Sequence, residues 1–102
     1  MKSSEPLIVK TRLSQKDDII IHPNEGYDLG IMNTKNPVKI FGNTTIETFN
    51  NAADNFFEGH IVLENNCSQG TVELNSKYWK KIGSPDKIRL FYEADKILIS
   101  NM

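Results

Sequence analysis

Short apolar segments, most of them separated by turn-forming residues, run along the sequence and restrict the chain to a β-rich fold. The first, Leu7 to Leu13, alternates apolar and polar side chains with the period of two that a half-buried strand requires. We expect His22 to Gly26 to form a turn, because proline fixes φ and glycine accepts a positive φ. Further strands are expected at 19–21, 27–32, 38–41, 60–64, 71–74, 87–92 and 96–99.

One longer segment carries the signals of a helix. Thr44 and Glu47 fit a capping box, in which each side chain bonds a backbone amide that the first turn leaves without a partner. The apolar side chains that follow recur on one helical face, and Gly59 is placed to end the helix in the left-handed conformation. These signals predict an amphipathic helix over about residues 45–58 that packs on a sheet. Its opposite face is mildly acidic and includes Asp54 and Glu58.

A second, short helix is expected over about residues 76–82. Asn75 or Ser76 is placed to cap it, and Gly83 is placed to end it. Taken together, the elements predict an α+β fold that is mostly β, a small antiparallel sheet or barrel with two helices. No repeat of fixed period is visible in the sequence.

Charge is unevenly distributed along the 102 residues, which we expect to form a single domain. Within it we expect an acidic strand-and-helix part over residues 1–59 and a β-β-α-β-β part over residues 60–102. The net charge is −1, but residues 1–74 carry six basic and ten acidic side chains, net −4, whereas residues 75–102 carry six and three, net +3. A surface that binds a polyanion is therefore expected toward the C-terminus.

The basic residues of the C-terminal segment are the strongest candidates for a binding surface. They occupy the short helix and one face of the strand after it, and they are Lys77, Lys80, Lys81, Lys87 and Arg89. This cluster predicts salt-dependent phosphate contacts with DNA or RNA, with Tyr78 or Trp79 as candidate stacking partners. The alternative is that Tyr78, Trp79 and Ile82 belong to the core while the lysines form a solvated face.

The residue types that usually carry catalysis or hold metals form no recognisable motif. His22 and His60 are not spaced with other ligands as zinc sites require, so neither a metal nor another cofactor is expected. Cys67 lies among neutral residues that offer no base to activate a thiolate, and no catalytic residue is assigned. A single cysteine indicates a reducing compartment, and no stretch is apolar enough to span a bilayer. We therefore expect a cytoplasmic protein without membrane contact.

The segment from Gly70 to Ser100 follows a loose pattern. A glycine opens an alternating strand, a short helix ends at glycine, and an acidic residue precedes a final pair of strands. The matching positions are Gly70, Val72, Leu74, Gly83, Asp86, Ile88, Leu90, Asp95, Ile97 and Ile99. In this pattern the segment resembles the swapped-hairpin domain of the AbrB, MazE and MraZ group of bacterial regulators and antitoxins.

This resemblance implies DNA binding and a homodimer formed through the C-terminal hairpins. Lys80 and Lys81 stand at the basic pair of the family's helix. Thr71 and Asn75 depart from the family pattern, in which a basic residue and a proline occupy these two positions. DNA contact is therefore expected from the helix rather than from Thr71.

Two non-catalytic functions follow from these patterns. The first is a small regulator of bacterial type that binds DNA through its basic C-terminal surface. The alternative is a protein-binding module or inhibitor of phage or plasmid type, antitoxin-like, that acts through the acidic helix face with Asp54 and Glu58 or through a sheet edge. The family resemblance favours the first function, whereas the net acidic charge favours the second.

Overall fold

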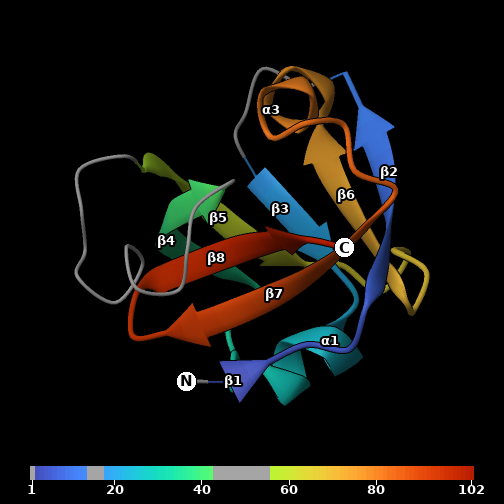
Figure 1. Cartoon of the computed structure of the whole chain (residues 1–102). Coiled ribbons are helices and arrows are strands. Elements are labelled where there is room, and N and C mark those ends of the chain that lie inside the picture. Colours follow the sequence, from blue (N-terminus) through green and yellow to red (C-terminus); the bar gives the residue numbers. More distant parts are fainter. Residues whose placement is uncertain (1, 14–17, 43–55) are drawn as a thin grey trace.

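Strand pairing closes the sheet of this protein into a barrel (Figure 1). The structure is a computed structural model that describes residues 2–13, 18–42 and 56–102. Eight strands and two helices lie in these residues. The strands are β1 (Lys2–Ser3), β2 (Leu7–Arg12), β3 (Asp18–Ile21), β4 (Lys35–Gly42), β5 (Phe57–Leu63), β6 (Thr71–Asn75), β7 (Lys87–Glu93) and β8 (Lys96–Asn101). The helices are α1 (Pro23–Asp28) and α3 (Ser76–Lys81).

All the described strands except β1 follow one another around the barrel in the order β7-β2-β6-β3-β5-β4-β8, and the pairing of β8 with β7 closes the ring. The two-residue strand β1 pairs with β7. The pairings β2–β6, β3–β5 and β4–β8 are parallel, and the remaining pairings are antiparallel. The expected small, mostly β barrel is confirmed, and three of its strand pairings are parallel.

The barrel contains two ββαβ units whose strands alternate around the ring. The first unit is β2-β3-α1-β4 and the second is β5-β6-α3-β7. Exchanging the two units reverses the strand order from β7 to β4 and leaves the same strands as neighbours. In both units the helix is capped at its C-terminal end by a buried aliphatic residue, and a glycine with positive φ follows. These pairs are Leu29-Gly30 and Ile82-Gly83.

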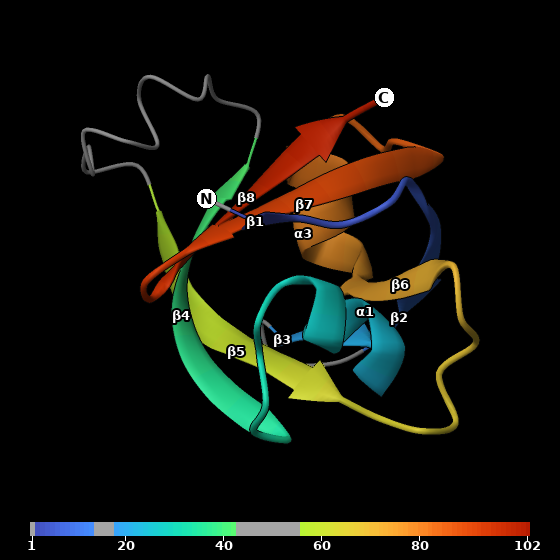
Figure 2. The same ribbon diagram turned by 90° about the horizontal axis from the view of Figure 1, so that it is seen from below.

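The core consists of aliphatic side chains that point into the barrel from alternate positions of the strands. On β7, for example, Ile88 and Leu90 are fully buried, while Arg89 between them faces outward. The helices α3 and α1 lie at opposite ends of the barrel (Figure 1, Figure 2). From these ends Tyr78 and Ile82 on one side and Leu29 on the other join the same core.

Helix α1 replaces the turn expected from His22 to Gly26. The strand expected at 27–32 does not form, because its first two residues end the helix and the other four are turn or irregular backbone. His22 caps the helix, because its Nδ1 accepts a hydrogen bond from the backbone amide of Asn24 at 3.0 Å. Pro23 occupies the first helical position, where its missing N–H is not needed and its fixed φ suits a helix. The expectation of a turn was wrong because proline also favours the first residue of a helix.

Gly26 allows α1 to lie close against β5. A Cβ atom at this position would lie 2.6 Å from Cδ2 of Leu63, which is closer than real Cβ contacts. The glycine that suggested a turn therefore serves close packing of a helix on a strand.

The amphipathic helix expected over about 45–58 falls mostly on residues 45–55, which lie outside the described part of the chain. Phe57 and Glu58, expected in its last turn, instead begin β5, where Phe57 pairs with Ile40 of β4. The second expected helix is confirmed as α3, with Asn75 as its N-cap.

Candidate nucleic-acid interface

Helix α3 exposes its lysines because its opposite face closes the barrel. The side chain of Asn75 accepts a hydrogen bond from the backbone amide of Lys77 at 2.9 Å and so starts the helix. Tyr78 and Ile82, one turn apart, are 6% and 3% exposed and face the core. The lysines lie on the remaining face and are all exposed; they are Lys77, Lys80 and Lys81. The last two also lie in the final turn, where positive charge stabilises the helix dipole.

The lysines of α3 are not paired with carboxylates of the described residues. Among the described residues, no ion pair joins Lys77, Lys80 or Lys81 to an acidic side chain. The ammonium group of Lys81 lies 4.9 Å from the centre of the Phe57 ring, which is a cation–π contact. This end of the barrel therefore offers a group of positive charges to an anionic ligand.

The aromatic residues of α3 serve packing rather than base stacking. Tyr78 is buried and meets the ring of Phe57 edge-on, with ring centres 5.2 Å apart. Trp79 packs against the core and donates its indole N–H to the carbonyl of Pro85 at 2.8 Å. The expectation of core packing is confirmed for Tyr78, whereas Trp79 is half-buried against the core with its N–H engaged.

Lys87 and Arg89 lie on the outer face of β7, and Lys87 is near the C-terminal end of α3. The side-chain amide of Asn101, at the end of β8, donates a hydrogen bond to the carbonyl of Ile82 at 2.6 Å. Because Asn101 pairs with Ile88 of β7, this contact brings the beginning of β7 close to the last turn of α3. The structure thus places Lys87 beside the lysine-bearing helix, with Arg89 two residues further along the strand.

The acidic residues expected to bind protein do not share a helix face in the structure. Asp54 lies outside the described residues. Glu58 is exposed on β5, opposite Lys39 of β4, and its assignment to a helix was wrong because this segment pairs with β4. Among the described strands only the two-residue β1 pairs on a single side, since closure of the barrel removes open edges.

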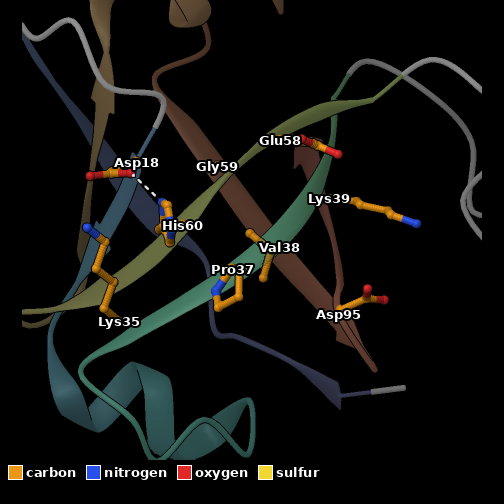
Figure 3. A pocket seen from close by; sticks show the side chains of 9 residues that line it. All are labelled: Asp18, Lys35, Pro37, Val38, Lys39, Glu58, Gly59, His60 and Asp95. Carbon is orange, nitrogen blue, oxygen red and sulfur yellow. Dashed lines mark ion pairs between the residues drawn. The ribbon is translucent and has the colours of Figure 1, made fainter.

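Glu58 lines an open groove of about 640 Å³ on the outer face of β3, β5 and β4 (Figure 3). At the opposite end of the groove Asp18 and His60 point toward each other, with Nδ1 of His60 3.4 Å from Oδ1 of Asp18. Asp18 is only 9% exposed. Lys35 and Lys39 add positive charge along β4. Sequence reasoning missed this groove because it depends on which strands pair, and only the alternation of His60 with its neighbours indicated an outward side chain.

The groove combines both signs of charge without an activated nucleophile. Within the described residues no group of three or more His, Cys, Asp or Glu side chains is arranged to hold a metal ion.

Cys67 is buried between β5 and β6, with its Sγ 3.6 Å from Oγ1 of Thr71. Burial raises the pKa of the Cys67 thiol more than the hydrogen bond with Thr71 lowers it, and the carboxylates of Glu73 and Glu25 raise it further. The thiol is therefore protonated near neutral pH and is a poor nucleophile.

Comparison with known protein families, curated proteins and solved structures returned no match to this chain. In the part of the chain that the structure describes, neither helix is long and apolar enough to cross a membrane. The functional interpretation consequently depends on the geometry and charge of the surfaces described above.

Proposed function

We propose that this protein is a small cytoplasmic regulator of bacterial type that binds DNA through contacts from α3 and β7 to phosphate groups. The observation that carries the proposal is the exposed face of α3, where Lys77, Lys80 and Lys81 stand together without acidic partners among the described residues. Ammonium groups in this arrangement release the counterions of a polyanion when they contact its phosphates, which favours binding at low salt. Lys87 and Arg89 extend the same surface onto the barrel wall.

The packing of the α3 aromatic rings favours duplex DNA over a single strand. Proteins that hold single strands commonly stack bases on exposed aromatic side chains. Tyr78 and Trp79 are engaged in the core and with Pro85, so the surface offers charge without a stacking platform. We expect backbone contacts that depend weakly on base sequence.

The resemblance to the swapped-hairpin group also implies a homodimer, which we include in the proposal. In this chain β7 pairs with β2, and β8 pairs with β4, so the hairpin completes its own barrel. A dimer of the swapped type would have to break both pairings and form them again between two copies. Light scattering across a range of protein concentrations tests this part, and the mass of a single chain at all concentrations would contradict it.

The DNA-binding proposal is tested by fluorescence anisotropy with a labelled duplex at about 50 mM salt. Lys80→Glu combined with Lys81→Glu should weaken binding by about 30-fold or more, because two attractive contacts become repulsive. The matched control is Lys2→Glu combined with Lys35→Glu, which makes the same charge change on exposed residues away from α3. Failure of the parent to bind, or equal losses in both double variants, would refute the proposal.

Protein binding remains the second candidate, because the groove beside Glu58 offers shape and mixed charge. A partner that docks there would meet Glu58 and Asp95 at one end and the Asp18–His60 pair at the other (Figure 3). The test is a pull-down from the native cell. Recovery of a stoichiometric protein that Glu58→Lys releases and Lys80→Glu does not would support this function, and recovery of nucleic acid alone would count against it.

A further inference from the structure

Strand β2 carries two basic residues that face outward beside the interface described above. Leu7 and Val9 point toward the core, so the alternation of the strand directs Ile8, Lys10 and Arg12 to the outside. Ile8 is 53% exposed, and Lys10 is exposed as well. Sequence reasoning overlooked these cations because they lie in the part of the chain whose net charge is negative.

The register of β2 places these residues between the two groups of cations on α3 and β7. At one end, Arg12 pairs with Asn75, the residue that caps α3 and accepts the amide of Lys77. At the other end, Ile8 pairs with Lys87 of β7. Lys10 lies midway between these two pairings. The outer face of β2 therefore connects the helix lysines with Lys87 along one line.

Two acidic residues of the described part of the chain, Glu73 and Asp86, lie to the two sides of this line. Glu73 on β6 pairs with Lys10 on β2. Its carboxylate, however, interacts with the Cys67 thiol, which lies on the side of β6 that faces β3. Asp86 is exposed, and its carbonyl accepts a hydrogen bond from the amide of Val9 at 2.9 Å. Of these two, Asp86 borders the line more openly.

We propose that Lys10 and Arg12 contact phosphate groups together with α3 and Lys87, so that the DNA backbone follows β2 along the barrel wall. This inference rests on the proposed DNA-binding function and specifies its footprint. Helix α3 alone is only about 9 Å long. The residues from Ile8 to Arg12 add about 13 Å of strand. Cations spaced along this strand suit the regularly spaced phosphates of a duplex backbone.

The test is the salt dependence of duplex binding, measured by anisotropy with the full chain. For a duplex, log affinity falls with log salt with a slope of about −0.9 per phosphate contact, so each contact removed reduces the steepness by about 0.9. Lys10→Ala combined with Arg12→Ala should therefore reduce the steepness of the slope by about 1.8. Lys2→Ala combined with Lys35→Ala, the control, should leave the slope of the parent unchanged.

The outcomes separate this inference from the function on which it rests. If Lys80→Glu with Lys81→Glu abolishes binding while the β2 double variant retains the parent slope, the β2 contacts are refuted and the DNA-binding function stands. If the parent does not bind, both fail. Nε of Arg12 is buried, so loss of Arg12 can also disturb folding. The exposed Lys10 provides the second variant. Lys10→Ala should reduce the steepness of the slope by about 0.9, and Lys10→Arg should restore it. Equal slopes for these two variants would overturn the inference.

Discussion

Nδ1 of His22 accepts a hydrogen bond from the backbone amide of Asn24 at 3.0 Å, and this contact starts helix α1. Replacement by alanine leaves that amide without its partner. We expect His22→Ala to lower the free energy of unfolding by about 1 kcal/mol, measured by urea denaturation. His22→Asn keeps an acceptor at the cap and should retain most of the stability. Equal losses in the two variants would show that the cap is not the source of the effect.

Gly42, at the end of β4, makes room for the buried face of α3. A Cβ atom there would overlap the Tyr78 hydroxyl and would lie 2.7 Å from Cγ2 of Ile82. We expect Gly42→Ala to destabilise the fold by about 1–3 kcal/mol in chemical denaturation, as overpacking of a core does. In a Tyr78→Phe background the loss should be smaller, because the closest atom is gone. An unchanged loss would locate the strain elsewhere.

Ala94 adopts a positive φ of 56° in the turn between β7 and β8. The left-handed region is unfavourable for alanine and readily accessible to glycine. Ala94→Gly should therefore stabilise the protein by roughly 0.5–1 kcal/mol, visible as a higher thermal midpoint. The control is Asp95→Gly, because Asp95 is not among the described residues with positive φ and glycine should destabilise the turn there. A gain from both substitutions would contradict this explanation.

The buried thiol of Cys67 makes stability depend on pH in the alkaline range. Burial, as the main cause, raises the pKa of Cys67 above its ordinary value of 9.0 in the folded state. The thiol therefore contributes its full stabilisation below pH 9, and this contribution is lost as pH rises through the raised pKa of the folded state. Between pH 8 and about 10, Cys67→Ala should lose stability less steeply than the parent.

Chemical labelling provides an independent measurement at the same residue. A thiol-specific reagent at pH 8 should modify the folded protein at least about tenfold more slowly than the urea-unfolded chain. Equal labelling rates in the folded and unfolded states would contradict the burial of Cys67.

Asp86 should weaken DNA binding, because its exposed carboxylate borders the line of cations on β2. We expect Asp86→Asn to tighten duplex binding by about threefold at low salt and to have little effect at high salt. Asp95→Asn makes the same charge change in the turn between β7 and β8 and serves as the control. If the two variants gain equally, the effect comes from net charge rather than from position.

The local elements of the C-terminal part were predictable because their signals are local. Alternation identified the strands that became β6, β7 and β8, and Asn75 together with Gly83 marked the ends of α3. Helix α1 escaped prediction because its proline and glycine also favour turns, and the histidine cap is an uncommon one. The packing of Leu63 against Gly26 distinguishes a helix from a turn here, and a local sequence pattern does not contain this long-range contact.

The arrangement of the strands was beyond local patterns for a similar reason. The parallel pairing of β2 with β6 joins residues more than half the chain apart, and nothing in either segment specifies the other. Lys10 and Arg12 could be assigned to an outward face by alternation, yet their position beside α3 follows only from this pairing. The duplication of the ββαβ unit could not be recognised from the sequence either. The features that the two units share, the caps Leu29 and Ile82 with a glycine after each, are common at the ends of helices.

The alternation of the two ββαβ units has a consequence for how the molecule assembles. Among the described strands, β2, β3 and β4 pair with no other member of their own unit, and the same holds for β5, β6 and β7. Neither unit can therefore build a sheet from its own strands, and apart from the pairings with β1 and β8 each strand pairing of one unit is made with the other unit. Each unit therefore needs the other to form its strand pairings. If the chain is cut between the two units, each piece should remain unfolded alone, and the two pieces should fold when they are mixed. A chain of this kind must fold through distant encounters, and so more slowly than its length suggests.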